Sequence, residues 1–383
     1  MVSNKFRFWF AFRVGILSAT LLGFSHSIFA QYTLRGQTLG MERNEPLPLA
    51  TIYLNNTTLG TSSDVDGNFS LNIPSGSYEL VISYTGYKTI VYRLPPEAPD
   101  SPLIFKLEPE EIELDEISVS SERDPSWFTN VKIFKKHFIG ESSEARKTII
   151  ENEDKIIIDH LKAEKQLQAF ANEPLVILNE ALGYRLEYEL ENFFFDFEED
   201  LVSYAGYPFF QELEGNARQK RRWARARQDT YEGSFMHFAR ILIAGGNPND
   251  HGFEVRPVKP NYKIQDNIPA TAENPTSQEV TIDSLLQPYH YFIETNENRY
   301  FILFKDKIEV VYNKKRADYY YRVGSKFRAG GLRVSKINLQ MESAELDING
   351  SLINPLAAIF EGYWGWEKIG NILPVDYQSE TSN

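Results

Sequence analysis

The stretch of residues 46–89, PLPLATIYLNNTTLGTSSDVDGNFSLNIPSGSYELVISYTGYKT, decides the fold of the first part of the chain. Its apolar residues alternate with polar ones at the period of a half-buried β-strand. The alternation predicts three strands, over residues 50–54, 68–73 and 78–84. Asp66 and Gly67 supply a tight turn, and the Pro-Ser-Gly of residues 74–76 supplies a second. Short strands joined by such turns are typical of a small antiparallel β-sandwich.

With residues 32–36 before it and residues 103–107 after it, this stretch resembles the carboxypeptidase-regulatory-like domain, a transthyretin-like β-sandwich. The resemblance is carried by short phrases in this order: Arg35-Gly36-Gln37, residues 45–52 (EPLPLATI), Leu59-Gly60-Thr61, residues 64–69 (DVDGNF), Ile73-Pro74-Ser75-Gly76 and Tyr84-Thr85-Gly86-Tyr87. We therefore place such a domain at residues 31–108. The resemblance implies a non-catalytic module that sits beside another domain in exported proteins, often of the Bacteroidota envelope.

An N-terminal signal peptide is predicted over residues 1–30. Three cations, Lys5, Arg7 and Arg13, precede an apolar run over residues 14–29, and the small residue Ala30 closes it. We expect cleavage after Ala30, export, and no transmembrane segment in the mature protein. An uncleaved membrane anchor is the alternative, but residues 25–27 interrupt the run and leave it short for a span.

The composition excludes several classes of function. The sequence has no cysteine, so disulfides, thiol catalysis and cysteine-ligated metals are excluded. Its formal net charge of −13 argues against a nucleic-acid partner. An exported protein of this kind must be held together by packing alone.

Residues 109–124 are charged and lack a long apolar face, which predicts a linker, and residues 117–119 could pair as a last edge strand. Residues 114–120, LDEISVS, resemble the stretch that follows this module in TonB-dependent outer-membrane receptors. The chain after Arg123 is too short for a plug and a barrel of about 22 strands. We therefore do not expect such a receptor, although a partnership with one stays open.

A second domain is predicted over residues 125–377, followed by a tail at residues 378–383. Apolar residues at 3–4 spacing from Phe128 to Phe138 indicate a helix. Residues 216–244 form the best helical pattern in the chain, and we predict one long helix there. Strands are expected over residues 156–161, 167–170, 175–178, 184–197, 253–258, 291–294, 300–304, 308–312 and 319–321. The predicted fold class is mainly β or α+β: a transthyretin-like sandwich, then an α+β domain with an antiparallel sheet and one long helix.

Two sets of residues could bind metal. His251 and Glu254 have the H-x-x-E spacing, with His290 as a third ligand, which would make a zinc site of a carboxypeptidase-like hydrolase. We consider this a weak alternative, because Glu is abundant and the segment also fits a turn that enters a strand. Asp64 and Asp66 could converge on calcium, but the strongest ligands of a calcium loop are missing, so a hairpin turn is the better interpretation. No cofactor is expected.

No nucleophile motif is present: the sequence contains neither G-x-S-x-G nor G-x-x-x-x-G-K-[ST]. Ser234 and His237 lie about one helical turn apart and could belong to a triad. Because we expect Ser234 inside a helix, close helix packing is the preferred interpretation. We therefore expect no catalytic residues.

The strongest local charge anomaly lies within the predicted long helix. Six cations surround Trp223: Arg218, Lys220, Arg221, Arg222, Arg225 and Arg227. Arg218, Arg221, Arg222, Trp223 and Arg225 could bind an anionic envelope polymer, lipid head groups or an acidic partner, through arginine forks and a stacking ring. The alternative is a solvated helix face whose charge is balanced by an acidic strand. The acidic residues of that strand are Glu187, Glu189, Glu191, Asp196, Glu198, Glu199 and Asp200.

An aromatic cluster near the end of the chain has two interpretations. Phe360, Tyr363, Trp364 and Trp366 could stack on a carbohydrate. Core packing is favoured, because glycines and isoleucines flank the cluster.

Taken together, the sequence favours a non-enzymatic exported accessory or binding protein of the cell envelope, periplasmic or outer-membrane associated. Its partner would be an outer-membrane protein or an anionic envelope polymer. The alternatives are a secreted zinc carboxypeptidase-like hydrolase with its site in the C-terminal domain, and a component that works with a TonB-dependent outer-membrane receptor.

Overall fold

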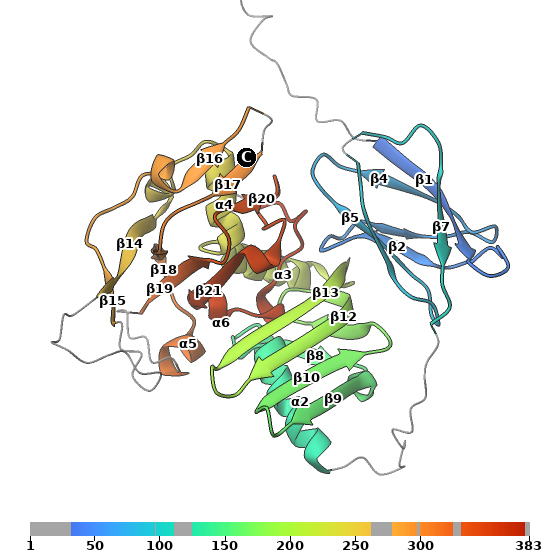
Figure 1. Cartoon of the computed structure of the whole chain (residues 1–383), viewed down its shortest axis with the longest axis horizontal. Helices are drawn as coiled ribbons and strands as arrows, with labels where there is room; N and C mark the ends of the chain where they lie inside the picture. The colour runs from blue at the N-terminus through green and yellow to red at the C-terminus, as the bar shows by residue number, and fades with distance from the viewer. Residues whose placement is uncertain are drawn as a thin grey trace, which may run out of the picture.

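The structure, a computed structural model, describes residues 32–95, 97–110, 125–261, 278–296, 299–324 and 331–379. The predicted signal peptide and the predicted edge strand at residues 117–119 lie outside these ranges. Figure 1 shows the N-terminal sandwich beside a six-stranded sheet, with the C-terminal strands on the opposite flank.

The N-terminal part is a sandwich of two small sheets, with strand orders β4-β1-β7 and β3-β2-β5-β6. The bounds are β1 Tyr32–Gly40, β2 Thr51–Leu54, β3 Gly60–Ser62, β4 Asn68–Ile73, β5 Glu79–Ser83, β6 Ile90–Arg93 and β7 Leu103–Leu107. Leu34, Ile52 and Leu80 meet in the core between the sheets. The predicted β-sandwich is confirmed, with two differences. The short strands β3 and β6 were not predicted, and β1 and β7 pair in parallel rather than antiparallel.

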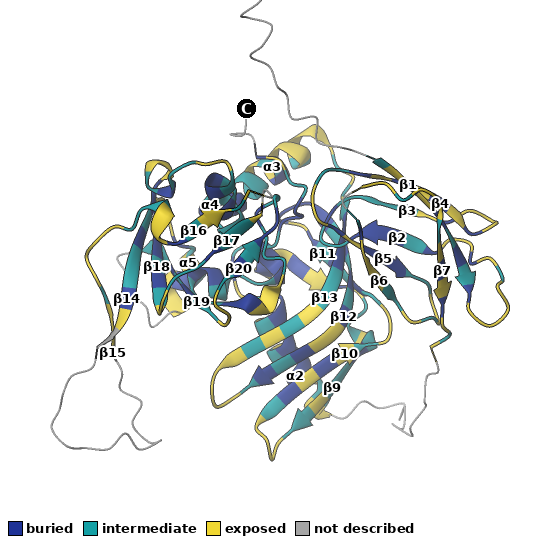
Figure 2. Ribbon diagram, turned by 45° about the horizontal axis from the view of Figure 1, so that its top comes forward, coloured by how far each residue is buried: buried dark blue, intermediate teal, exposed yellow. Residues whose placement is uncertain are grey.

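The middle of the chain forms a six-stranded sheet whose one face is covered by helix α2 (Pro125–Phe138). The strand order is β8-β11-β12-β10-β9, and β13 pairs with β12. The bounds are β8 Thr148–Ile150, β9 Ile156–Leu161, β10 Gln166–Ala171, β11 Leu175–Asn179, β12 Tyr184–Asp196 and β13 Leu201–Glu212. Phe134 and Phe138 of α2 pack on Leu167, Tyr188 and Phe193 of the sheet. Buried and exposed residues alternate along these strands (Figure 2).

Strand β13 was not predicted from the sequence. It is the long edge partner of β12, and the two pair over almost their whole length. Gly206 and Pro208 lie within it, and both residue types are depleted in strands. Pro208 is tolerated because an edge strand needs ladder hydrogen bonds on one side only.

The C-terminal part adds a five-stranded sheet, β15-β14-β18-β19-β21, and a three-stranded sheet, β16-β17-β20. The bounds are β14 Phe253–Asn261, β15 Gln278–Thr281, β16 Phe292–Glu294, β17 Tyr300–Ile302, β18 Lys307–Arg316, β19 Leu332–Leu339, β20 Ala344–Leu346 and β21 Ala358–Gly362. These pairings are antiparallel, so the predicted α+β class with antiparallel sheets is confirmed. One predicted strand is wrong: residues 319–321 begin helix α5 (Tyr319–Gly324), because the Asp318 carboxylate accepts a hydrogen bond from the Tyr320 N–H at 2.7 Å and starts a helical turn.

The predicted single helix over residues 216–244 is wrong, because the structure has two helices there. They are α3 (Ala217–Tyr231) and α4 (Phe235–Ile243). Gly233 takes a φ of +83°, and a Cβ at this position would lie 2.5 Å from the Tyr312 ring. Ser234 is therefore not inside a helix but caps α4, accepting a hydrogen bond from the His237 N–H. Among the residues that the structure describes, none of the helices has the length and apolar character that a membrane crossing needs.

The C-terminal segment returns to the N-terminal sandwich. Val375 is buried in the sandwich core, and its N–H donates to the Asn56 carbonyl at 2.7 Å. The Asp376 carboxylate accepts hydrogen bonds from the Thr58 backbone and hydroxyl. Ser379, which belongs to the predicted solvated tail, is buried at 6% exposure. The tail prediction is therefore wrong at Ser379, and residues 380–383 lie outside the described residues.

His137, in the last turn of α2, makes the fold sensitive to acid. Its ring stacks on Phe195 at 3.8 Å, and burial, helped by Lys136, lowers its pKa from 6.5 to about 4. The unfolded chain therefore takes up a proton first, and stability falls as the pH drops from 6.5 towards 4. The substitution His137→Phe keeps a ring stacked on Phe195 but cannot take up a proton. We expect it to reduce the acid-induced loss of folding free energy by about 1–2 kcal/mol, a figure that allows for solvent screening of the partly exposed ring. Urea unfolding at neutral and acid pH measures the difference, and an equal acid loss in both proteins would contradict it.

Candidate functional site

Helix α3 begins at a capping box. The Asn216 Oδ1 accepts hydrogen bonds from the Arg218 and Gln219 N–H groups, both at 3.0 Å. In return, the Gln219 Oε1 accepts from the Asn216 N–H at 3.0 Å. Three backbone donors that would otherwise face solvent are thus satisfied by side chains. The capping box therefore fixes the backbone of the first turn of the helix.

Trp223 anchors α3 to the six-stranded sheet. The side chain is 5% exposed, and its Nε1 donates to the Glu180 carbonyl at 3.0 Å. The ring fills the space beside Gly183 and Gly215, where an added Cβ would lie 2.3 and 2.6 Å from it. Trp223 is therefore unavailable to a ligand, and its prediction as a stacking ring is wrong.

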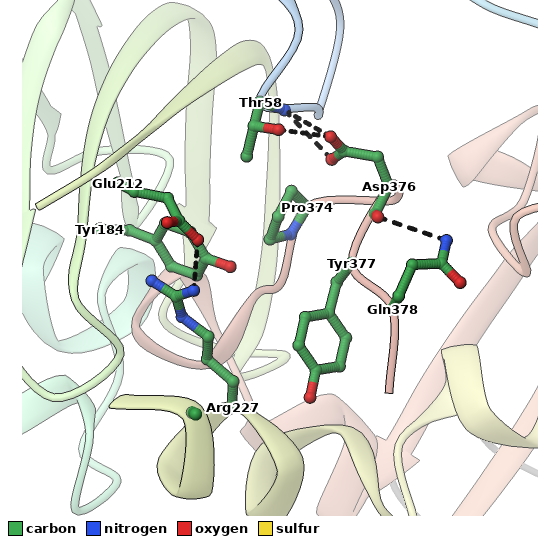
Figure 3. Close-up of a pocket in the computed structure, with 9 residues that line it drawn as sticks. Thr58, Tyr184, Glu212, Arg227, Pro374, Asp376, Tyr377 and Gln378 are labelled. Carbon is green, nitrogen blue, oxygen red and sulfur yellow. Dashed lines mark hydrogen bonds and ion pairs between the residues drawn. The ribbon is translucent and has the colours of Figure 1, made fainter. Parts of the chain in front are cut away.

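Arg227 is also an internal anchor rather than a free cation. Its guanidinium donates to the Leu182 and Gly183 carbonyls at 2.7 and 3.0 Å and lies 3.8 Å from the centre of the Tyr184 ring. It also pairs with the Glu212 carboxylate. Figure 3 shows Arg227 and Glu212 together on one side of a small pocket.

That pocket, of about 300 Å³, lies where α3, the six-stranded sheet and the C-terminal segment meet the sandwich. Thr58 and Asp376 bond to each other on one side, and Arg227 and Glu212 on the other (Figure 3). Its charged groups are therefore engaged by the protein itself. We interpret this place as a joint between the parts of the molecule.

Five cations of α3 remain on the surface, and we call them the basic face: Arg218, Lys220, Arg221, Arg222 and Arg225. Within the described ranges, none of them makes a hydrogen bond through its side chain or an ion pair with another residue. The first turn holds no acidic residue. Positive side chains there oppose the helix dipole, and several pairs at i,i+3 and i,i+4 repel each other. The arrangement costs local stability unless an anion is nearby.

Among the described residues, the acidic side chains of residues 187–200 form no ion pair with the basic face, so that part of the solvated-face interpretation is wrong. Glu187 pairs with Arg185, and Glu198 pairs with Lys165. Glu191 accepts a hydrogen bond from the Tyr207 hydroxyl at 2.8 Å. The basic face keeps its charge uncompensated by this strand.

Comparison with known families tests the identity of the N-terminal sandwich. Residues 34–119 match the family model of the CarboxypepD_reg-like domain. The chain carries a CarboxypepD_reg-like domain. The prediction from the phrases in residues 35–87 is thereby confirmed.

Other similarities add little to the CarboxypepD_reg-like assignment. Two solved structures are described as DUF3823 family proteins, from Bacteroides ovatus and Parabacteroides merdae. They are 11% and 12% identical to this chain, each covers 49% of it and 83% of its own chain, and the TM-scores are 0.17 and 0.15. A likeness at such TM-scores supports no conclusion about this chain. No curated protein matches it.

The residues of the alternative zinc site are engaged in other contacts. Glu254 pairs with Arg256 and accepts a hydrogen bond from Asn313. The His290 Nδ1 accepts from the Gln287 N–H at 3.0 Å, and His251 lies in a short 3₁₀ turn. Across the part of the chain that the structure describes, no group of three or more His, Cys, Asp and Glu side chains is placed to hold a metal ion. The proposed ligand set of His251, Glu254 and His290 is therefore not supported.

The other candidates are structural. Within the CarboxypepD_reg-like domain, the Asp64 Oδ1 accepts hydrogen bonds from the Asp66 and Asn68 N–H groups, which confirms a tight turn. The turn is not a hairpin, because it joins β3 and β4, which lie in different sheets. Ser234 caps α4, and the His237 Nδ1 accepts from the Gly233 N–H at 3.1 Å, so both are engaged with the backbone.

The aromatic cluster of Phe360, Tyr363, Trp364 and Trp366 packs against the core of the C-terminal part. Tyr363 and Trp364 are 3% and 8% exposed, and the Trp364 Nε1 donates to the Gly233 carbonyl at 2.8 Å. The core-packing interpretation is confirmed, and these rings offer no platform for a sugar.

Proposed function

We propose that the protein is a non-enzymatic, exported binding protein of the cell envelope that attaches through its basic face to phosphate-bearing lipid head groups. The observation that carries this proposal is the set of five exposed cations on α3 without a partner among the described residues. Arginine presents a planar fork of donors that matches phosphate oxygens, and four of the five are arginine.

The shape and chemistry of the basic face favour a lipid surface over the other anionic partners. With Trp223 buried, the face has no ring of its own to stack on a sugar. All five cations are exposed, and none of them lines the pocket of Figure 3. The four arginines fall within about 100° of one another around α3, with Lys220 on the other side. Arginines on one side of a helix suit a planar anionic surface, where each contributes about 1 kcal/mol.

Export and an envelope location are supported by the sequence. The predicted signal peptide precedes the CarboxypepD_reg-like domain, and the resemblance of that domain implies exported proteins of the envelope. The same resemblance implies a module without catalysis, which agrees with a binding role.

Replacing Arg221, Arg222 and Arg225 together with glutamine is expected to weaken binding to vesicles of phosphatidylcholine and phosphatidylglycerol by about 10- to 100-fold. Co-sedimentation of the mature protein with these vesicles measures the loss. The variant is not expected to lose thermal stability, because mutual repulsion and opposition to the helix dipole are both relieved.

The matched control replaces Arg35, Arg43 and Arg93 with glutamine. These three arginines are exposed on the CarboxypepD_reg-like domain, so their replacement removes the same three positive charges from another surface. We expect the control to bind vesicles like the wild type. Equal losses in both variants would show a general charge effect, and an absence of wild-type binding would refute the lipid proposal.

A further inference from the structure

A cleft of about 1150 Å³ separates the CarboxypepD_reg-like domain from the six-stranded sheet. Its floor is the face of the sheet opposite α2, with Glu189 and Phe194 of β12. Its roof is the β2–β5 side of the sandwich, with Tyr53, Ser83 and the loop at residues 84–89. The cleft exceeds the roughly 300–1,000 Å³ that is typical of small-molecule pockets.

The two walls of the cleft are tied together, so it is formed before any ligand arrives. The Ser83 hydroxyl of the sandwich donates to the Glu189 carboxylate of the sheet. The Tyr53 hydroxyl donates to the Tyr207 carbonyl at 2.9 Å, and the Tyr53 ring stacks on Phe209 at 4.9 Å. A preformed cleft avoids much of the ordering cost of binding.

An irregularity in β12 gathers polar groups on the floor. Before it, the even-numbered residues Tyr184 to Leu190 are buried, and Glu187 and Glu189 between them line the cleft. The register with β13 shifts between Leu190 and Asn192, and afterwards Phe193 and Phe195 are the buried residues. Glu191 and Asn192 therefore both line the cleft. Bulges of this kind are common beside functional sites, where they re-aim side chains.

The cleft is negatively charged. Its lining includes five glutamates, of which Glu173 and Glu187 pair with cations. Glu189 and Glu191 are instead bonded to the hydroxyls of Ser83 and Tyr207, which leave their charge uncompensated. Burial, with Glu110 and Glu187 nearby, raises the pKa of Glu189. The one lysine in the lining, Lys88, is already paired with Glu108.

Aromatic rings lie among these carboxylates: Tyr84, Tyr87, Phe170, Phe194 and Tyr207. A ring face attracts an ammonium or guanidinium group, and a carboxylate beside it adds charge-assisted hydrogen bonds. This combination recognises lysine and arginine side chains. The chain's own residues 111–124, which follow Glu110, hold six acidic residues and one arginine, so their net charge has the wrong sign to fill the cleft.

We propose that this cleft binds an extended, lysine- or arginine-bearing segment of a protein partner. The volume of the cleft, larger than that of a typical small-molecule pocket, suits a polypeptide segment, and its carboxylates and rings suit the basic side chains of that segment. The site is separate from the basic face of α3 and has the opposite charge.

The test is binding of a labelled peptide of alternating lysine and threonine to the mature protein, measured by fluorescence anisotropy. We expect the double variant Glu189→Gln with Glu191→Gln to weaken binding by about 10- to 100-fold, because two charge-assisted contacts are lost. Glutamine can still accept the Ser83 and Tyr207 hydrogen bonds, so the fold is kept. The control, Glu141→Gln with Glu164→Gln, removes the same charge at two exposed positions and should bind like the wild type.

Three results would overturn the proposal: no binding of the peptide to the wild type at low salt, equal losses in both double variants, or full displacement of the peptide by spermidine, which would assign the site to a small polyamine. The vesicle experiment separates this inference from the proposed function. The glutamine variants of the cleft should bind vesicles normally, and the variant of Arg221, Arg222 and Arg225 should bind the peptide normally.

Discussion

Replacing Trp223 with alanine is expected to lower the free energy of unfolding by about 3–5 kcal/mol. The indole fills the space beside Gly183 and Gly215, and its Nε1 satisfies the Glu180 carbonyl. Alanine would leave a cavity and a partly buried carbonyl without its donor. Because α3 is held to the sheet through this ring, we expect the substitution to lower the stability of the fold and not only the affinity for a ligand.

Urea unfolding followed by circular dichroism measures the effect of Trp223→Ala. Trp223→Phe is the matched variant, since it keeps a ring in the site but loses the hydrogen bond, and it should cost less. If Trp223→Ala instead left stability unchanged and abolished vesicle binding alone, Trp223 would be a ligand-stacking residue after all.

Replacing Arg240 with methionine should cost about 3–5 kcal/mol, because three carbonyls lose their donor together. The guanidinium of Arg240, on α4, donates to the carbonyls of Asn349, Val375 and Tyr377, each at 2.8 Å. Two of these belong to the C-terminal segment that enters the sandwich. Methionine retains much of the apolar stem, so the loss reports the hydrogen bonds.

Limited proteolysis and chemical unfolding check the Arg240→Met prediction. We expect early cleavage near the C-terminus and an unfolding transition that separates into two steps, as the sandwich loses its connection to the rest. The stability of Arg240→Lys should lie between those of the wild type and Arg240→Met, because one ammonium group cannot reach all three carbonyls in the same geometry. A single transition at the wild-type position in Arg240→Met would refute this role.

The sequence predicted the sandwich well, since its strands alternate cleanly and are separated by glycine and proline turns. It failed where neighbours in space decide the structure. Gly233 breaks the long helix because Tyr312, far along the chain, occupies the space that a side chain would need. Strand β13 is hidden by Gly206 and Pro208, which only an edge position tolerates.

The candidate sites were predictable to different degrees. The basic face follows from the composition of residues 218–225, but the sequence could not show that Trp223 and Arg227 turn inward to glycines and carbonyls of the sheet. The acidic cleft was partly indicated by the sequence, because glutamates alternate along β12 and therefore lie on one face of the strand. Its roof comes from residues about a hundred positions earlier, so no local pattern could reveal it.

The insertion of Val375 into the sandwich core has a consequence for biogenesis. Residue 375 leaves the ribosome well after all the strands of the N-terminal sandwich have been made, so the first domain lacks one of its core side chains until that later part of the chain has been synthesised. The final packing of the sandwich is thereby coupled to the arrival of Val375. An isolated fragment of residues 32–110 would expose the apolar surface that Val375 covers.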